Sequence, residues 1–357
     1  MSTIDAVSVR AYTVPTDAPE SDGTAEWDAT DVVVVEVRSG ATRGLGWTYA
    51  PEAAAHLVGS HLAEVVRGRP ADDVAALWLE CGSRLRNAGR PGIAWCALSA
   101  LDIAIWDLRA RLRGEPLVAL LPACRHRVPV YGSGGFCTYG ADRVAEQLGT
   151  WVAGGIPRVK MKVGREPADD PARIDAARDA IGDAELYVDA NGAFAAKEAI
   201  RWARRYASDW AVTWFEEPVS SADFDGLRLV RGQTTVDVAA GEYGYVLADF
   251  RNLVGAVDCL QADVTRCGGI TGLLRVNGLS AAYDLDLSGH CAPQLGAHAF
   301  CAVDRLRHLE YFHDHVRVEA LLFDGVLEPV DGALVPDRSR PGHGLALKRA
   351  DAERWAA

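Results

Sequence analysis

From residue 128 onward, short apolar runs recur along this chain, and each ends in an ionisable residue 20 to 27 positions after the previous one. Turn-rich and helix-like stretches separate the runs, which is the period of a βα unit. A (β/α)₈ barrel presents the carboxyl ends of its parallel strands at one rim, so these side chains would surround a single cavity. They are Lys160 and Lys162, Asp189, Glu216, Glu242, Asp263, His290 and Glu310.

The residues before the barrel have a different pattern. β-Branched runs at 4–14, 31–39 and 42–49 predict a three-stranded antiparallel meander, and helical periodicity follows at 51–67, 71–87 and 92–113. The fold class is therefore α/β: residues 1–125 form an α+β capping domain, residues 126–320 a TIM-like barrel, and residues 321–357 return to complete the cap. The barrel helices are expected at 141–153, 171–181, 194–206, 222–231 and 269–282.

Two segments carry their own local expectations. The stretch VPTDAPESDGTAEWD at 14–28 is rich in Pro, Asp and Gly, which predicts an exposed mobile loop rather than a strand. The short apolar sequence VLEPV at 326–330 reads as a strand that returns toward the cap.

Composition excludes several classes of partner. The net charge of −12 leaves no basic stripe to neutralise phosphates, which argues against nucleic acid. The first residues do not show the charged and then apolar pattern of a signal peptide, and no apolar stretch is long enough to span a membrane. We therefore expect a cytoplasmic protein without a membrane segment. The 8 cysteines lack CxxC pairing, which favours buried structural thiols in a reducing compartment.

Three carboxylates at successive strand ends predict a metal site. Asp189, Glu216 and Glu242 offer oxygen ligands without histidine or cysteine, the donor set that Mg²⁺ prefers. The alternative is that each acid forms a structural ion pair with an interior lysine. Three clustered anions without a cation would repel one another strongly at low dielectric, which favours the metal.

Two further groups predict proton transfer. Lys160 and Lys162 lie two apart on one strand and therefore leave by the same face. A second ammonium and a divalent cation nearby would lower the pKa of a lysine toward that of a general base. On the far side, Asp263 and His290 end adjacent strands, where a hydrogen bond would make the imidazole a second acid or base. Glu310 either hydrogen-bonds a ligand opposite the metal or anchors a loop.

The motifs around these residues resemble the enolase superfamily and, within it, the mandelate racemase subgroup. The likeness covers nearly the whole chain: SALDIAIWDLRARLRGEPL (99–117), VKMKVG (159–164), YVDANGAF (187–194), WFEEPV (214–219), AAGEYGY (239–245), QADVTRCGGIT (261–271) and SGHCAPQLGAH (288–298). The resemblance implies Mg²⁺ on Asp189, Glu216 and Glu242, Lys162 as catalytic base and Asp263–His290 as the opposing dyad. It implies that Lys160 and Glu310 contact the substrate carboxylate. Arg266 stands where cycloisomerase and dipeptide-epimerase relatives would carry a second lysine, which disfavours muconate cycloisomerisation and dipeptide epimerisation.

These groups support abstraction of the proton α to a carboxylate. Loss of a β-hydroxyl would then make the protein an acid sugar (aldonate or aldarate) dehydratase giving a 2-keto-3-deoxy acid, which is the favoured interpretation. Reprotonation by His290 would instead make it a 2-hydroxyacid racemase or epimerase, and a barrel that binds metal and acid without turnover is the third alternative. Expected substrate contacts are Asn191, Lys160, Trp27, Thr138 and Tyr139, and relatives of this kind usually form homo-oligomers.

Overall fold

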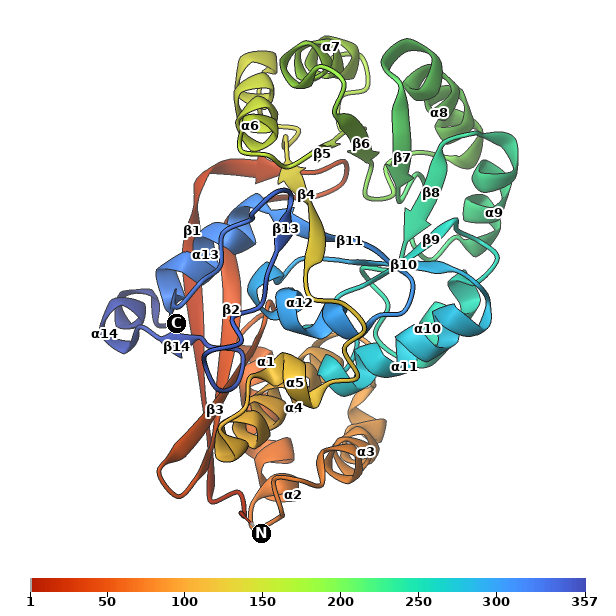
Figure 1. Ribbon diagram of the computed structural model, residues 1–357. Helices are drawn as coiled ribbons and strands as arrows, with labels where there is room; N and C mark the ends of the chain where they lie inside the picture. The colour runs from red at the N-terminus through yellow and green to blue at the C-terminus, as the bar shows by residue number, and fades with distance from the viewer. Residues whose placement is uncertain (1) are drawn as a thin grey trace.

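The computed structural model describes residues 2–357 and contains the predicted three-stranded antiparallel sheet. Its strands are β1 (Ala6–Ser21), β2 (Glu26–Ser39) and β3 (Thr42–Thr48), in the order β1-β2-β3. The expected helices follow as α1 (Ala53–Leu57), a π turn (Val58–Leu62), α2 (Ala63–Val66), α3 (Val74–Arg84), α4 (Ile93–Arg113) and α5 (Leu117–Leu120). Figure 1 shows this cap below the barrel, with the red and orange strands running up beside it.

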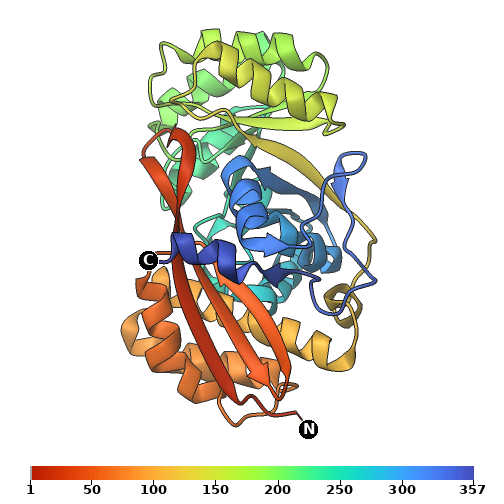
Figure 2. The ribbon, with the colours of Figure 1, turned by 90° about the vertical axis from the view of Figure 1, so that its left-hand side faces the viewer.

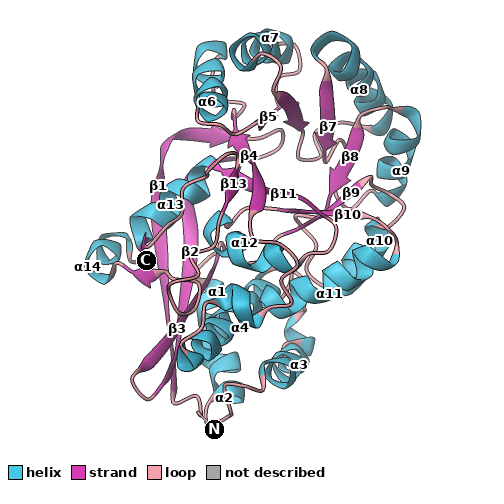
Figure 3. Ribbon diagram, in the orientation of Figure 1, coloured by secondary structure: helices cyan, strands magenta, loops and turns pink. Residues whose placement is uncertain are grey.

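The barrel is closed and has eight parallel strands, because β11 also pairs with β4. Helices surround the strands, as the cyan and magenta elements of Figure 3 show. In chain order the elements are β4 (Val128–Gly134), α6 (Ala141–Ala153), β5 (Arg158–Lys162), α7 (Asp170–Ile181), β6 (Glu185–Asp189), α8 (Ala196–Trp210), β7 (Val212–Glu216), α9 (Phe224–Gln233), β8 (Asp237–Ala240), α10 (Leu247–Leu253), β9 (Cys259–Ala262), α11 (Gly269–Ala282), β10 (Asp286–Gly289), α12 (Pro293–Ala299), β11 (Leu306–Phe312) and α13 (His313–Leu322). The predicted fold class is confirmed.

Aromatic side chains fill the barrel two residues below the strand ends. Successive strand residues point to opposite faces, so a residue two positions before an inward-facing strand end also points inward. Tyr187 and Trp214 lie below Asp189 and Glu216 in this way, and their rings stack with centroids 5.6 Å apart. The polar strand ends therefore stand on a packed floor, not over an open pore.

The cap sheet packs on α4 with almost no space between the backbones. Gly44 and Gly46 lie two apart on one face of β3. A Cβ on Gly44 would lie 2.2 Å from the carbonyl oxygen of Ala104, and one on Gly46 would lie 2.3 Å from that of Ala100. Only hydrogen fits at these two positions, so the glycines set the distance between sheet and helix.

One buried carboxylate ties the cap to the barrel. Asp102 of α4 accepts hydrogen bonds from Thr271 N at 2.9 Å and Thr271 Oγ1 at 2.6 Å, in the first turn of α11. Backbone N–H groups in the first turn of a helix have no partner inside the helix, so this bond also satisfies one of them. The cap is thereby fixed next to the carboxyl ends of the strands.

The prediction of a loop at residues 14–28 was wrong. β1 continues to Ser21 and β2 begins at Glu26, with one register irregularity between Pro15 and Glu20. Tertiary contacts override the turn-forming composition: Trp27 Nε1 donates to Glu20 Oε2 at 2.9 Å, and the Trp27 ring packs edge-on against Phe136 of the barrel. The segment is thus a β-hairpin whose tip rests on the barrel rim.

The strand predicted at VLEPV, residues 326–330, is also absent. Of these residues only Val330 forms a bridge, with Ala333. The side chain of Gln294 makes the hydrogen bonds that a strand neighbour would make: its Nε2 donates to Leu327 O at 2.9 Å and its Oε1 accepts from Leu327 N at 2.5 Å. A side-chain amide thus pairs with the backbone here, in place of the hydrogen bonds of a neighbouring strand.

The C-terminal segment does return to the cap, as predicted. It contains β12 (Phe323–Asp324), β13 (Ala333–Leu334), β14 (Ala346–Leu347) and α14 (Arg349–Ala352). Ala356 pairs with Tyr12 of β1, and Ala357 N donates to Ala11 O at 3.1 Å. Figure 2 shows this dark blue segment crossing the red strands. Within residues 2–357, no helix has both the length and the apolar character needed to cross a membrane.

Gly46→Ala tests the close contact between the cap sheet and α4. The added methyl group would meet the Ala100 carbonyl, so we expect the free energy of unfolding to fall by about 1–3 kcal/mol or more. Gly278→Ala is the matched control because no atom lies within 4 Å of its added Cβ and the position is helical. That variant should gain about 0.5–1 kcal/mol. Equal effects of the two variants in denaturant unfolding would contradict this account of the packing.

Candidate active site

All eight predicted strand-end side chains meet at one rim of the barrel and are buried, none more than 6% exposed. A cavity of about 350 Å³ lies above them, between barrel and cap. Its barrel wall includes Lys162, Asn191, Glu242, Arg266, His290, Cys291, Glu310 and His315, and its cap wall includes Asp22, Trp27, Thr30 and Tyr49. The barrel thus supplies the floor, and the β1–β2 hairpin and the end of β3 supply the roof.

Local backbone geometry directs the acids inward. Glu242 lies two residues past β8, and Gly241 before it has φ +139°; a Cβ there would lie 2.1 Å from Gln261 O. Only glycine permits that turn. Asn191, at φ 44°, donates its backbone N–H to Asp189 Oδ1 at 2.9 Å, which fixes this carboxylate.

The predicted metal ligands lie together. Carboxylate oxygens of Asp189, Glu216 and Glu242 come within 4.8 Å of one another. Trp214 Nε1 donates to Glu216 Oε2 at 3.0 Å and so orients that side chain. Glu242 Oε2 is buried and lies 3.1 Å from His290 Nε2, and the charge of His290 lowers the pKa of Glu242 against the effect of burial. A triad of oxygen donors alone fits Mg²⁺.

Buried charge around the cavity also calls for a divalent cation. Burial, and next the charge of Asp189, raises the pKa of Glu216 to about 8. Burial and the charges of Glu242 and Asp189 raise the pKa of Glu217 well above its ordinary range, so this residue is held neutral. The other acids of the rim face Lys160, Lys162, Arg266 and the imidazole of His290; they are Asp189, Glu216, Glu242, Asp263 and Glu310. Mg²⁺ on the triad would favour the ionised form of Glu216, because a nearby positive charge lowers the pKa of a carboxyl group.

The ion pairs that formed the alternative to a metal site exist only in part. Lys160 Nζ lies 2.5 Å from Glu216 Oε1, 2.9 Å from Glu310 Oε1 and 3.2 Å from Asp189 Oδ2. Lys162 Nζ lies 2.6 Å from Asp189 Oδ2. Glu242 has no lysine partner among the described residues. The lysines therefore hold two of the triad, whereas Glu242 lies 3.1 Å from His290 Nε2 and 3.9 Å from an Arg266 nitrogen.

The lowered pKa expected for Lys162 is not produced by the protein groups. Burial is the largest single effect and lowers the pKa of Lys162, but the charges of Asp189, Glu242 and Glu216 together outweigh burial and Lys160, and the pKa is raised above its ordinary value. The second ammonium lies where the sequence predicts it, but the surrounding anions have the larger combined effect. A divalent cation on Asp189 is the charge that opposes this effect.

The predicted dyad is present. His290 Nδ1 lies 2.8 Å from Asp263 Oδ2, and Thr265 donates both its N–H and its hydroxyl to Asp263 Oδ1 at 2.7 Å. Because Asp263 accepts from Nδ1, the other ring nitrogen, Nε2, faces the cavity. Burial lowers the pKa of His290, but the surrounding anions, including Glu242 and Glu310, raise it well above its ordinary value.

Glu310 faces the cavity and also holds the neighbouring loop. Its Oε1 accepts from Lys160 Nζ at 2.9 Å, and its Oε2 accepts from the backbone N–H of Cys291 at 3.1 Å. The two roles weighed for this residue are therefore compatible.

Of the predicted substrate contacts, three are at the cavity or its floor and two are elsewhere. Trp27 and Asn191 line the cavity, and Lys160 lies beneath it. Thr138 and Tyr139 line a separate hollow beside α6 and α7. Thr138 Oγ1 donates to Pro19 O at 2.7 Å, so it supports the hairpin from outside.

Sequence reasoning missed several residues of the wall. Arg266 entered only as a departure from a pattern, yet its Nε lies 3.5 Å from Asp263 Oδ2. Tyr49 and His315 stack with ring centroids 3.4 Å apart, although they are far apart in sequence. Cys291 follows His290 directly, and the turn after a barrel strand was a signal that could have identified it.

Two family models match the chain. The model "Mandelate racemase / muconate lactonizing enzyme, N-terminal domain" matches residues 6–122. The model "Enolase C-terminal domain-like" matches residues 143–352. Together they cover the cap and most of the barrel.

The similarity to known proteins extends over nearly the full length of this chain. The 3,6-anhydro-alpha-L-galactonate cycloisomerase of Streptomyces coelicolor is 32% identical over 96% of this chain and 97% of its own. A mandelate racemase/muconate lactonizing enzyme-like protein from Rubrobacter xylanophilus has 55% identity and a TM-score of 0.98, covering 99% and 100% of the two chains. L-talarate/galactarate dehydratase from Salmonella typhimurium, liganded with Mg and L-lyxarohydroxamate, has 29% identity and a TM-score of 0.90, covering 99% and 93%. Curated relatives comprise dehydratases, cycloisomerases and epimerases.

Mg²⁺-induced stabilisation tests the carboxylate triad. A ligand that binds only the folded state stabilises it, by about 2.7 kcal/mol when the ligand concentration is one hundred times Kd. The Tm therefore rises with ligand concentration. We expect MgCl₂ to raise the Tm of the wild type and Glu216→Gln to lose that increment. Glu185→Gln, at the opposite end of β6 from Asp189, should keep it. An unchanged Mg²⁺ increment in Glu216→Gln would exclude this residue as a ligand.

Proposed function

The chain belongs to the enolase superfamily, in its mandelate racemase/muconate lactonizing enzyme family, and from this premise we propose that it is a Mg²⁺-dependent acid sugar dehydratase. The reaction removes the proton α to a carboxylate and a hydroxyl group from the β-carbon. Its product is a 2-keto-3-deoxy acid.

One observation carries the proposal: proton-transfer groups stand on opposite sides of the carboxylate triad. Around the closed ring, β9, which leads to Asp263, is four strands from β5 in either direction. Lys162 thus faces the Asp263–His290 dyad across the cavity, and Asp189, Glu216 and Glu242 lie on the intervening strands. A substrate whose carboxylate points to the triad would present its α-carbon between the two bases.

Each residue then has a defined task. Mg²⁺, when bound, supplies positive charge that offsets the triad and stabilises the negative charge developing on the substrate carboxylate. Lys160 lies within 2.9 Å of Glu310 and 2.5 Å of Glu216, so its ammonium is held next to the position of that carboxylate. Lys162 Nζ takes the α-proton, which requires that the cation on Asp189 offset the anions that raise the pKa of this lysine. The anions around His290 raise its pKa and so favour the protonated imidazole, from which Nε2 donates to the departing hydroxyl.

In the elimination, atoms balance within the substrate and these two side chains. The α-carbon loses its proton to Lys162, the carbon–oxygen bond at the β-position breaks, and the hydroxyl leaves as water with the proton from His290. The resulting enol becomes the 2-keto acid when its β-carbon takes a proton and the hydroxyl on its α-carbon releases one to solvent. Trp27, Asp22 and Asn191 are proposed to contact substrate hydroxyls, because all three line the cavity.

The racemase or epimerase reaction is the second candidate, because it uses the same opposed bases. His290 would then reprotonate the α-carbon on the face opposite Lys162, and no hydroxyl would leave. The similarity to a talarate/galactarate dehydratase over nearly the whole chain favours elimination. A barrel that binds acid without turnover would need only one of the two proton-transfer groups.

A screen of aldonic and aldaric acids with Mg²⁺, including lactone and anhydro forms, tests the proposal. We expect one configuration to yield a 2-keto-3-deoxy acid. Lys162→Ala and His290→Asn should each lower kcat by about 10²–10⁴-fold, the usual contribution of a positioned acid or base. His56→Asn, at an exposed histidine of the cap, is the control and should retain the wild-type rate.

Other products would overturn the dehydratase assignment. An epimer at the α-carbon without keto acid would establish the racemase or epimerase reaction. Ring opening or isomerisation of an anhydro or lactone substrate would establish a cycloisomerase. Wild-type turnover in both Lys162→Ala and His290→Asn would contradict the assignment of the bases. Self-association and a cytoplasmic location remain predictions.

A further inference from the structure

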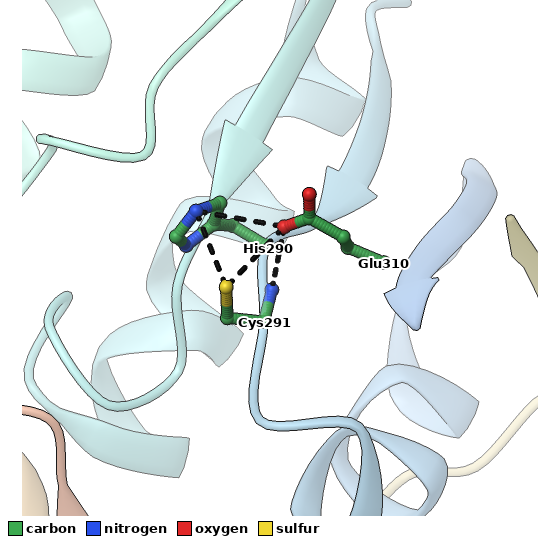
Figure 4. A group of neighbouring side chains, drawn as sticks. All are labelled: His290, Cys291 and Glu310. Atoms are coloured by element: carbon green, nitrogen blue, oxygen red, sulfur yellow. Dashed lines mark hydrogen bonds and ion pairs between the residues drawn. The ribbon is translucent and has the colours of Figure 1, made fainter. Parts of the chain in front are cut away.

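The residue after the dyad histidine brings a thiol into the cavity. Cys291 and Ala292 have φ values of 49° and 43°, a left-handed conformation that is unusual for two successive non-glycine residues. This turn directs the Cys291 side chain back toward His290 and Glu310. Figure 4 shows the imidazole, the thiol and the carboxylate pointing toward one another.

The three side chains converge with the dimensions of a metal site. Cys291 Sγ lies 3.4 Å from His290 Nε2 and 3.3 Å from Glu310 Oε2, and Nε2 and Oε2 are 3.5 Å apart. In a tetrahedral zinc site, with bonds of about 2.3 Å to sulfur and about 2.0–2.1 Å to nitrogen or oxygen, ligand atoms are about 3.3–3.6 Å from one another. All three separations are within or close to that range.

We propose that His290 Nε2, Cys291 Sγ and Glu310 Oε2 form a second metal site, selective for a thiophilic divalent cation such as Zn²⁺. The fourth position opens to the cavity that all three residues line, where a water molecule or an oxygen of a bound acid completes the tetrahedron. No ligand belongs to both sites, but the sites adjoin, because His290 Nε2 also lies 3.1 Å from Glu242 Oε2 of the carboxylate triad.

The ligand chemistry separates the two sites. Asp189, Glu216 and Glu242 offer only hard oxygen atoms, which suit Mg²⁺, whereas sulfur and imidazole nitrogen favour zinc or cobalt. Asp263 already binds the other ring nitrogen of His290 at 2.8 Å. A carboxylate on the second nitrogen is the arrangement that orients zinc-binding histidines and raises their basicity.

A plain packing role for Cys291 is the alternative. A small buried thiol fills space as well as alanine or serine, and burial raises its pKa above the ordinary value, so the free side chain is protonated. Metal binding replaces that proton, which passes to solvent, and the thiolate then coordinates. Packing alone does not explain why sulfur, nitrogen and oxygen meet at coordination distances in a strained turn.

Zinc at this site would remove His290 Nε2 from proton transfer. Inhibition by zinc in the presence of saturating Mg²⁺ therefore follows, a consequence that rests on the proposed function. Metal binding does not rest on it, so the test uses no substrate.

Cobalt absorption tests the site directly. The reduced full-length chain is saturated with Mg²⁺ to occupy the triad and titrated with Co²⁺, whose thiolate complexes show a charge-transfer band in the near ultraviolet. We expect the band to saturate at one equivalent per chain and to disappear when Zn²⁺ is added. Cys291→Ser should abolish the band, and Asp263→Asn should weaken cobalt binding by about 10–100-fold.

Cys124→Ser is the matched control, because it removes an exposed thiol away from the cavity and should leave the band unchanged. Absence of the band in the wild type would overturn the proposal whether or not the variants fold. A band that persists in Cys291→Ser and is lost in Cys124→Ser would also overturn it. None of these outcomes depends on finding a substrate.

Discussion

The crowding of buried acids and bases at the rim of a closed barrel is the constraint on which the rest of this site depends. Buried anions are tolerated only when cations or hydrogen-bond donors face them. Lys160 is completely buried and contacts acids from three strands, so it holds the rim together, yet burial and the charge of Asp189 still raise the pKa of Glu216. A divalent cation on the triad would favour the ionised form of Glu216, and in the proposed function the same cation makes the removal of an α-proton feasible.

The cap gives this charged rim a shape. Gly44 and Gly46 let the cap sheet approach α4 closely, and Asp102 fixes α4 to the start of α11. The β1–β2 hairpin then reaches the barrel rim, where Trp27 and Asp22 face the cavity. In the proposed function the barrel therefore provides the reacting groups, and segments of the cap select the acid that fits above them.

Much of the fold and of the candidate site could be predicted from sequence, because strand ends that recur at regular spacing along the chain lie around one rim of a parallel barrel. The positions of Asp189, Glu216 and Glu242 follow from that period alone. Features that depend on contacts between distant segments could not be predicted. The contacts of Trp27 stabilise a hairpin where a loop was predicted, and the side chain of Gln294 makes the hydrogen bonds that a predicted strand would have made. The direction of the pKa shift of Lys162 could not be predicted from sequence either, because it depends on the balance between burial, Lys160 and several surrounding anions.

The site as a whole brings two kinds of ligand chemistry side by side in one cavity. Oxygen atoms suited to a hard cation lie on β6, β7 and past β8, whereas nitrogen, sulfur and a further carboxylate lie past β10 and on β11, and the two groups meet where His290 Nε2 lies 3.1 Å from Glu242 Oε2. His290 belongs to both proposals, as proton donor and as metal ligand. Competition between these roles would make the activity of the chain sensitive to the metal composition of its surroundings.

Hydrogen exchange at the α-carbon tests the central claim most directly. A saturating sugar acid that the chain binds is incubated in D₂O with and without Mg²⁺, and deuterium at C2 of the substrate or deuterium in the product is followed by NMR. The account predicts C2–H bond cleavage that requires Mg²⁺ and is lost in Lys162→Ala. Cleavage that proceeds equally without Mg²⁺, or undiminished in Lys162→Ala, would contradict it.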